Sequence, residues 1–231
     1  MGTQGGETSD GTQHCMEVTL QLPPVETYRS GVDLTSQGEV PSCVYFIVEG
    51  VVKLVHVCPD GRERIVELGS KGELVAAQSA ILGLKCFATA TTATKSKLAR
   101  WRSADFAARL SRDPTFSFRV SRLLSLQSDK LYRQFLQLTY LTARERFEAL
   151  VRFWRDIPDA GGRLPAGEFD LPMSREELGQ ILSITPYHVS RLLVALEQDR
   201  FVIRQGRRIR VVSAVPRPAA ATAAPVSSRH H

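Results

Sequence analysis

The sequence has few residues that could build a metal centre, a disulfide framework or a membrane anchor. Its four cysteines, Cys15, Cys43, Cys58 and Cys86, include no C-x-x-C pair, and there are five histidines, so neither a zinc site nor a disulfide framework is indicated. No apolar run approaches the roughly eighteen residues that cross a bilayer. The N-terminus also lacks the charged start and apolar core of a signal peptide. We therefore expect a cytoplasmic protein with no membrane partner, no metal and no cofactor.

The length and the charge of the chain limit its class. With 231 residues, of which 43% are hydrophobic, the chain can fill the cores of two modest domains. A formal net charge of +6 and a pI near 9.4 favour an anionic partner such as nucleic acid. A solvated basic face without any partner would give the same count.

Residues 172–197 carry the pattern of two short helices joined by a tight turn. Ser174 is suited to cap the first helix, and Glu177 follows three residues later, which is the spacing of a capping box. Thr185 is suited to cap the second helix, and Pro186 falls at its first position, where a missing N–H costs nothing. Apolar residues give each helix one buried face. The pattern predicts a helix-turn-helix, although an ordinary helical hairpin has similar signals.

A basic hairpin is predicted after these helices. Residues 201–204 and 207–212 alternate apolar and basic positions around Gln205 and Gly206, as expected for two strands and a turn. Five arginines and no acidic residue fall between positions 200 and 210. A winged helix-turn-helix has this order of elements, with wing cations that neutralise phosphates while the second helix meets base edges. Double-stranded DNA is therefore the predicted partner.

The first half of the chain has the signals of short strands. Segments rich in β-branched residues occur at 43–48, 51–57 and 62–68, and turn residues with glycine separate them. Residues 88–101 alternate threonine and alanine with other types and are predicted to form one further strand. Many short strands joined by tight turns indicate a small antiparallel barrel or β-roll.

A long helix is predicted after Asp113 and Pro114. Leucine, valine and glutamine recur through it at alternating steps of four and three, the heptad spacing of a coiled-coil seam. The predicted dimerisation residues are Val120, Leu124, Gln127, Leu131, Gln134, Leu138 and Leu141. A single helix packed on its own domain is the alternative. The two glutamines at equivalent positions favour a homodimer, because polar seam residues fix the register.

These patterns divide the chain into five parts. Residues 1–15 are rich in glycine and small polar side chains, and residues 214–231 in alanine and proline, so both ends are predicted to be disordered. Residues 16–110 are predicted to form the β-roll, 113–141 the dimerisation helix and 142–213 the winged helix-turn-helix. The predicted fold class is α+β.

This order of elements resembles the CRP/FNR family of bacterial transcription regulators over residues 24–212. The motifs that carry the resemblance are Gln-Gly-Glu at 37–39, Val-Tyr-Phe-Ile-Val-Glu-Gly at 44–50, Asp-Gly at 60–61, Gly-Glu at 72–73, Ser-Arg-Glu-Glu-Leu-Gly-Gln-Ile-Leu at 174–182 and Val-Ser-Arg-Leu-Leu at 189–193. The resemblance implies a jelly roll like that of cyclic-nucleotide-binding domains, used as a sensor, and a homodimer on a palindromic DNA site. It implies contact with RNA polymerase if the protein is an activator. It implies no catalytic residue and no enzymatic activity.

The sensor region departs from the best-known branches of that family. The cyclic-nucleotide branch holds the ribose with a Gly-Glu pair and the phosphate with an Arg-Ser/Thr-Ala run, but here these positions carry Ala76 and Ala77, and Phe-Ala-Thr at 87–89. A buried phosphate without a cation is costly, so cyclic nucleotide is the less favoured effector. Cys15 stands alone where the iron-sulfur branch has three clustered cysteines. His56 is the single histidine of the domain, which argues against haem.

The resemblance assigns the DNA contacts residue by residue. Arg191 matches the base-contacting arginine of the family, whereas Tyr187 stands where members commonly have an acidic residue. The half-site is therefore predicted to differ from the familiar TGTGA and TTGAT. The predicted DNA-binding residues are Ser174, Arg175, Thr185, Tyr187, His188, Ser190, Arg191, Arg204, Arg207 and Arg208.

Other functions stay open at this point. The β-roll could be the active part, as a small-ligand or thiol-redox sensor on which DNA binding depends, with Cys43, Cys58 or Cys86 as the thiol. DNA binding without any effector is a third alternative. A cupin-type enzyme would need several histidine and carboxylate ligands around a metal, which a domain with one histidine does not supply.

Overall fold

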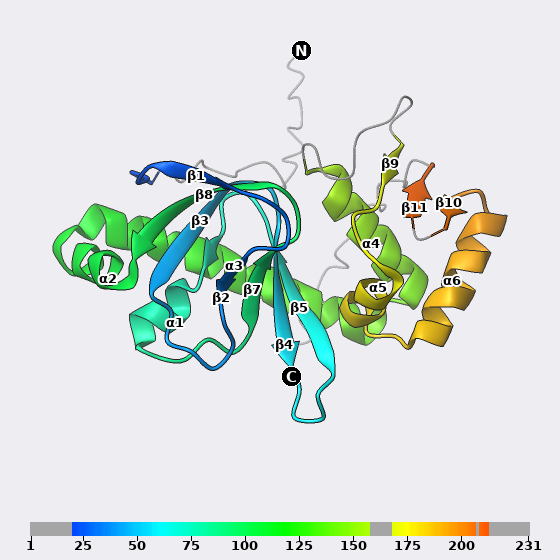
Figure 1. The fold of residues 1–231 in the computed structure, drawn as a ribbon, viewed down its shortest axis with the longest axis horizontal. Helices are drawn as coiled ribbons and strands as arrows, with labels where there is room; N and C mark the ends of the chain where they lie inside the picture. Colours follow the sequence, from blue (N-terminus) through cyan, green and yellow to red (C-terminus); the bar gives the residue numbers. More distant parts are fainter. Residues whose placement is uncertain (1–19, 158–167, 207, 213–231) are drawn as a thin grey trace, which may run out of the picture.

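The computed structural model describes residues 20–157, 168–206 and 208–212 (Figure 1). The predicted tails at 1–15 and 214–231 lie outside these ranges, as does Arg207. Within them the chain forms a β-rich part, a long helix and a helical part with a small sheet, so the predicted α+β class is confirmed. None of the helices in these ranges is long and apolar enough to cross a membrane.

The β-rich part consists of two antiparallel sheets of four strands each, which confirms the predicted β-roll. The first sheet contains, in spatial order, β1 (Val25–Tyr28), β8 (Ser96–Arg102), β3 (Cys43–Glu49) and β6 (Leu74–Val75). The second sheet contains β2 (Asp33–Thr35), β7 (Thr89–Thr92), β4 (Val52–Val57) and β5 (Glu63–Gly69). Ile47, Val52 and Leu98 are fully buried in a cluster to which both sheets contribute.

The single strand predicted over residues 88–101 is wrong. The structure has two strands there, and they belong to different sheets, β7 and β8. The chain turns between them, where the backbone N–H of Ala93 donates to the carbonyl of Val51 at 2.8 Å. Gly50 makes this crossing tight: it has φ +94°, and an added Cβ would lie 2.7 Å from Cα of Ser96. The alternation of residue types continues through the turn, so it could not reveal the break.

A second cluster lies between the first sheet and three helices, α1 (Ala77–Leu82), α2 (Ser103–Arg112) and α3 (Pro114–Tyr140). Trp101, Phe106 and Phe116 meet in it with ring centroids 5.5 to 6.1 Å apart. Such large buried rings contribute much of the hydrophobic stabilisation of a core. They fix the start of α3 against the β-roll.

The long helix α3 begins with a cap that its sequence provides. The side chain of Asp113 accepts a hydrogen bond from the backbone N–H of Phe116 at 2.9 Å, and Pro114 occupies the first turn. The helix has 27 residues, so it is about 40 Å long at 1.5 Å per residue. Figure 1 shows it running behind the sheets from α2 toward the helical part.

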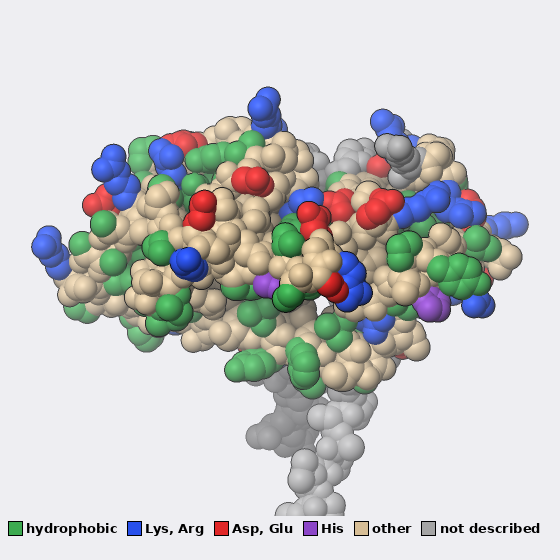
Figure 2. Space-filling model, turned by 60° about the horizontal axis from the view of Figure 1, so that its bottom comes forward, with side chains coloured by type: hydrophobic (Ala, Val, Ile, Leu, Met, Phe, Trp, Pro, Cys, Tyr) green, Lys and Arg blue, Asp and Glu red, His purple; other side chains and the backbone are tan. Residues whose placement is uncertain are grey.

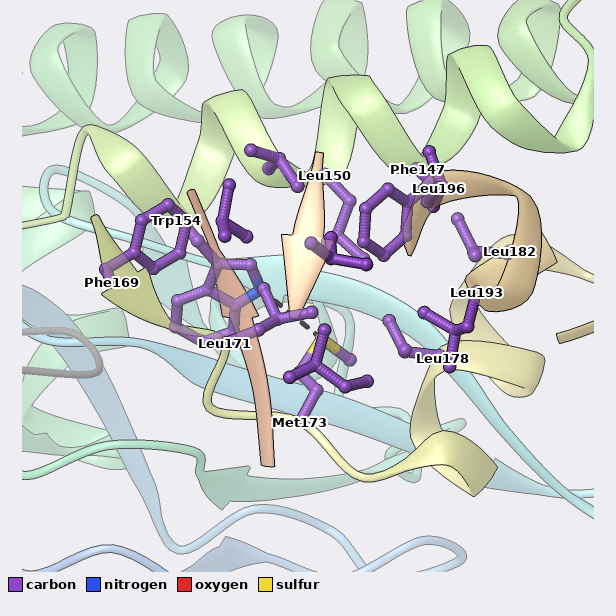
Figure 3. Packing of buried hydrophobic residues seen from close by; sticks show 14 of the residues in the cluster. Phe147, Leu150, Trp154, Phe169, Leu171, Met173, Leu178, Leu182, Leu193 and Leu196 are labelled. Carbon is purple, nitrogen blue, oxygen red and sulfur yellow. Dashed lines mark hydrogen bonds between the residues drawn. The ribbon is translucent and has the colours of Figure 1, made fainter. Parts of the chain in front are cut away.

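The helical part contains α4 (Ala143–Arg155), α5 (Arg175–Leu182) and α6 (Pro186–Gln198), with a sheet in the order β10 (Val202–Gln205), β11 (Arg208–Val211) and β9 (Phe169–Asp170). Phe147 and Trp154 of α4 pack in one core with leucines of α5 and α6 (Figure 3). The indole N–H of Trp154 lies 3.3 Å from the sulfur of Met173, which precedes α5. The winged helix-turn-helix is therefore built around a buried core to which α4, α5 and α6 all contribute.

This core extends into the β-roll. Val51, Ile65 and Leu68 belong to the same cluster of buried side chains as Trp154 and the leucines of α5 and α6. An ion pair adds to the contact, with Nζ of Lys53 on β4 lying 2.5 Å from Oε1 of Glu177 on α5. The two parts of the chain are thus joined by packing as well as by α3.

Candidate nucleic-acid interface

The first helix of the helix-turn-helix, α5, starts with the predicted capping box. The hydroxyl of Ser174 accepts from the backbone N–H of Glu177 at 3.1 Å, and the carboxylate of Glu177 accepts from the N–H of Ser174 at 2.8 Å. Arg175, in the first turn, donates to the carbonyl of Gly206 at 3.3 Å. The start of α5 is therefore held next to the turn of the β10–β11 hairpin.

The turn between α5 and α6 depends on a glycine that sequence reasoning did not single out. A Cβ on Gly179 would lie 3.1 Å from the carbonyl oxygen of Ile184, closer than almost all such contacts. Ser183 adopts a left-handed conformation with φ +53° to end α5. The signal available in the sequence was a glycine inside a helical pattern, which usually marks close packing.

The second helix, α6, begins as predicted and presents its opening turns to solvent. The side chain of Thr185 accepts from the N–H of His188, and Pro186 occupies the first turn. Val189, Leu193 and Leu196 are buried, at 1% exposure or less. The four side chains predicted to read bases are all exposed: Tyr187, His188, Ser190 and Arg191.

These four exposed side chains make contacts within the opening turns of α6. The rings of Tyr187 and His188 lie edge to face with centroids 5.7 Å apart, and the guanidinium carbon of Arg191 is 5.9 Å from the centre of the Tyr187 ring. Nδ1 of His188 is 2.9 Å from the hydroxyl of Thr185. The hydroxyl of Ser190 donates to the carbonyl of Pro186 at 3.1 Å. Arg191 thus offers most of the hydrogen-bond donors on this face, and Tyr187 is placed to orient it.

The arginines of the β10–β11 hairpin differ in how they are used. Arg204 donates two hydrogen bonds to Glu197, at 2.8 and 2.6 Å, and the same contact lowers the pKa of Glu197. Arg210 is paired in the same way with Asp170 at 2.9 Å. Arg208 is exposed and has no ion pair recorded within the described part of the chain. Figure 2 shows Lys and Arg side chains gathered at the end of the molecule formed by α6 and this hairpin.

The predicted dimer seam on α3 needs correction at two positions. Val120 is 1% exposed and belongs to the core of its own chain. The side-chain amide of Gln127 is hydrogen-bonded to the backbone N–H and carbonyl of Leu74 at 3.2 and 2.9 Å. Both residues therefore face the β-roll and not a second chain. Of the others, Leu131 and Leu138 are exposed, and Leu124, Gln134 and Leu141 are half-buried.

The three cysteines among the described residues form no disulfide. Cys86 is buried, as expected of an apolar filler, whereas Cys43 and Cys58 are half-buried, and all three are free thiols. In the described ranges no three His, Cys, Asp or Glu residues are grouped so that they could hold a metal ion.

A cavity lies at the place where the sequence predicted a diverged effector pocket. Ala76, Ala77, Phe87 and Ala88 are among its lining residues, together with residues of β5 and α3, and neither lysine nor arginine lines it within the described chain. A cyclic phosphate needs a cation or a set of N–H donors when it is buried. Among the described residues, the lining therefore offers no side-chain cation to a cyclic phosphate.

The fold and this exposed helix define the class of protein: a DNA-binding regulator that joins a β-roll to a winged helix-turn-helix. Residues 25–113 match the family model of the cyclic nucleotide-binding domain, and residues 119–214 match that of the Crp-like helix-turn-helix domain. The chain belongs to the CRP/FNR family of transcription regulators.

Relatives and solved structures agree with this assignment. The chain is 26% identical over 200 residues to the transcriptional activator protein FnrL of Cereibacter sphaeroides, covering 84% of this chain and 78% of that protein. It is 25% identical over 184 residues to the transcriptional activatory protein AadR of Rhodopseudomonas palustris, covering 78% and 73%. The structure of TTHB099, a CRP-family regulator from Thermus thermophilus, superimposes with a TM-score of 0.69 at 21% identity, covering 81% and 92%.

Proposed function

We propose that the protein is a sequence-specific transcription regulator that binds a palindromic DNA site as a homodimer. In this proposal Tyr187, His188, Ser190 and Arg191 read base edges in the major groove. The contacts to phosphates come from the start of α5, with Ser174 and Arg175, from the cap residue Thr185, and from the wing arginines Arg207 and Arg208. Arg204 contributes by holding the wing against α6 through Glu197.

One observation carries the proposal: the opening turns of α6 are exposed on the same end of the molecule as the basic hairpin. A recognition helix must project its N-terminal side chains from the surface, and its flanks need cations that meet phosphates on both sides of the groove. Arg191 in particular keeps its guanidinium exposed beside Tyr187. A bidentate contact with guanine suits that geometry.

The exposed apolar face of α3 supports the homodimer. Tyr132, Phe135 and Leu136 are 71, 65 and 52% exposed, and large exposed apolar side chains close together on one helix often mark an interface. We keep the leucines of the predicted seam that lie on α3 and replace each of its other residues there by the residue that follows it in the sequence. The heptad series is then Ser121, Leu124, Ser128, Leu131, Phe135 and Leu138.

Selection of binding sites from random DNA tests the proposal. The wild-type protein should select a palindrome whose half-site differs from TGTGA and TTGAT. Arg191→Ala should lose preference at one base pair of each half-site and bind the selected DNA more weakly by about 1–3 kcal/mol. Arg112→Ala, on the exposed surface of α2, is the control and should select the same site as the wild type. No enrichment of any sequence, or unchanged preference in Arg191→Ala, would refute the proposed reading helix.

The mass of the protein in solution tests the seam. Phe135→Glu should convert a dimer to a monomer in native mass spectrometry, because each chain would bring a charge into the interface. Val40→Glu, at a residue 60% exposed in the β-roll, introduces the same charge elsewhere and should leave the dimer intact. A monomeric wild-type protein would contradict the homodimer.

The direction of regulation follows from a second measurement. The relatives FnrL and AadR are named as activators, and activation requires contact with RNA polymerase. In vitro transcription with RNA polymerase on a template that carries the selected site gives more transcript for an activator and less for a repressor. Adding a reductant or an oxidant to the same reaction tests thiol control.

A further inference from the structure

The cavity in the β-roll has one wall from α3, the helix that also carries the exposed apolar face. Leu54 on β4, Val75 on β6 and Ala90 on β7 form apolar surface on one side, and Leu124 and Leu131 of α3 form it on the other. Its volume is about 70 Å³. This is less than the cavity of about 150 Å³ that holds a benzene molecule in another protein, so a ligand would have few heavy atoms.

Two carboxylates line this apolar space, and they share one lysine. Nζ of Lys130 on α3 lies 2.8 and 2.7 Å from the two carboxylate oxygens of Glu73, and 2.7 Å from the carbonyl oxygen of Leu68. An ammonium group has three donors, so these contacts use all of them. Glu67 receives only a longer ion-pair contact, with its Oε1 at 3.6 Å from the same Nζ.

Glu67 is therefore left without a hydrogen bond at a buried oxygen. The residue is 7% exposed, and its Oε1 has no hydrogen-bond partner among the residues that the structure describes. Burial is the main cause that raises the pKa of this carboxyl, and the neighbouring Lys130 opposes the rise. A buried acceptor without a donor is rare in folded proteins and points to a missing group. Glu73, by contrast, also accepts from the hydroxyl of Ser70 at 3.1 Å.

The charge of this group of residues defines the chemistry that would complete it. When both carboxylates are ionised, the single lysine leaves one negative charge uncompensated, next to apolar walls. A protonated amine would supply both the missing donor and the missing positive charge. A carboxylate or phosphate would add a second uncompensated negative charge.

We propose that this cavity binds a small organic cation, a primary amine on a short apolar chain, with its ammonium group on Glu67. The proposal rests on the proposed function only in treating such a ligand as an effector of DNA binding. The coupling is structural: Lys130, Leu124 and Leu131 are residues of α3, and Leu68 belongs to the core that β5 shares with α5. An ammonium group bound at Glu67 therefore lies next to α3 and next to the residues of β5 that pack against α5. These are the two elements that join the β-roll to the DNA-binding part.

Three probes of similar size separate the alternatives. Isobutylamine, isobutanol and isobutyrate share one apolar group and differ in a cationic, neutral or anionic head. Titration calorimetry on the full-length protein at neutral pH should give the amine a Kd of about 1 mM or tighter. Isobutanol should bind about tenfold more weakly, because the charge-assisted hydrogen bond is lost. Isobutyrate and cyclic AMP should not bind.

A matched pair of variants locates the binding. Glu67→Gln keeps the shape and removes the charge, and should lower the affinity for isobutylamine about tenfold, to that of the alcohol. Glu63→Gln is the control, since Glu63 lies on the same strand but is exposed, and it should bind as the wild type does. In the wild-type protein, nuclear Overhauser contacts from the amine methyl groups should reach Leu54 and Leu124, so the site is tested even if Glu67→Gln fails to fold.

The inference is overturned if isobutylamine does not bind at about 10 mM. This concentration is well above the Kd expected for a ligand of so few atoms. The inference is equally overturned if isobutyrate binds as well, if Glu67→Gln keeps the full affinity, or if the contacts fall on surface residues. Selection of DNA sites without ligand tests the proposed function separately. If the protein selects a DNA site but does not bind the amine, only the effector proposal is refuted. If it binds the amine but selects no DNA site, only the proposed function is refuted.

Discussion

The end of the molecule formed by α5 and α6, called the reading end below, and the cavity of the β-roll differ in how their polar groups find partners. At the reading end, Ser174 pairs with Glu177 and Thr185 with His188, each three residues along the chain, and the side chains of Tyr187 and Arg191 are exposed. Beside the cavity, Lys130 reaches Glu73 and Leu68 from 57 and 62 residues away. The comparison indicates that polar contacts at the reading end form between neighbours along the chain, while those beside the cavity join distant segments and leave one acceptor unpaired among the described residues.

Removing the lysine beside the cavity should have the largest effect on stability. Lys130→Met leaves the buried Glu67 and the half-buried Glu73 without a counter-charge and should lower the free energy of unfolding by about 3 kcal/mol, measured by urea denaturation. Lys71→Met, at an exposed lysine of the same region, should change it by less than about 0.5 kcal/mol. Equal effects of the two variants would erase the contrast between cavity and surface.

Loss of a cap at the reading end should have a smaller effect on stability and a matching effect on DNA binding. Thr185→Ala removes the acceptor for the N–H of His188 and should lower the free energy of unfolding by about 1 kcal/mol. Thr185→Ser keeps the hydroxyl and should restore most of it. Fluorescence anisotropy with the selected DNA should show the same order of affinities, wild type above Ser above Ala.

The two wing arginines should separate in their salt dependence. Arg208 is exposed, so Arg208→Ala should reduce the slope of log Kobs against log salt concentration by about 0.9, the contribution of one phosphate contact. Arg204 is held by Glu197 at 2.6 Å, so Arg204→Ala should change that slope less. A larger slope change in Arg204→Ala would mean that the ion pair opens when DNA binds.

Acidity should affect the two regions in opposite directions. The raised pKa of Glu67, caused first by burial, means that its contribution to stability is present below about pH 4.5 and is lost as pH rises through the folded-state pKa. The lowered pKa of Glu197, caused by hydrogen bonds from Arg204, gives stability that is lost as pH falls. The unfolding free energy of Glu67→Gln relative to the wild type should therefore be higher at pH 7.5 than at pH 4.5. A constant difference would contradict the burial of a carboxyl at this position.

Sequence patterns predicted the reading end well because its determinants are local. Both caps and the buried faces of α5 and α6 follow spacings of three and four residues, and the structure reproduces them. The order of the β-roll, the long helix and the winged helix-turn-helix was predicted for the same reason, whereas the break between β7 and β8 was not. Gly179 was missed, since its role depends on the carbonyl of Ile184 across the turn.

The cavity and the seam could not be predicted because distant segments decide them. Val120 and Gln127 satisfy a heptad as well as Ser121 and Ser128 do, and Leu124, Leu131 and Leu138 fit both series. Only the β-roll, through contacts such as that of Leu74 with Gln127, shows which face is occupied. The pairing of Glu67 and Glu73 with Lys130 also joins residues that are far apart in the sequence. The order of charges along the chain therefore does not predict it.

The core that extends from the helical part into the β-roll affects whether the C-terminal part can be produced as a separate fragment. Ile65 and Leu68 of β5 cover side chains that also pack under α5, and Lys53 pairs with Glu177 at the start of that helix. A fragment beginning after α3 would keep its recognition helix but expose this apolar surface and leave Glu177 without its lysine. The winged helix-turn-helix is therefore a poor unit for expression or domain exchange on its own, and a chimera needs β4 and β5 to travel with it.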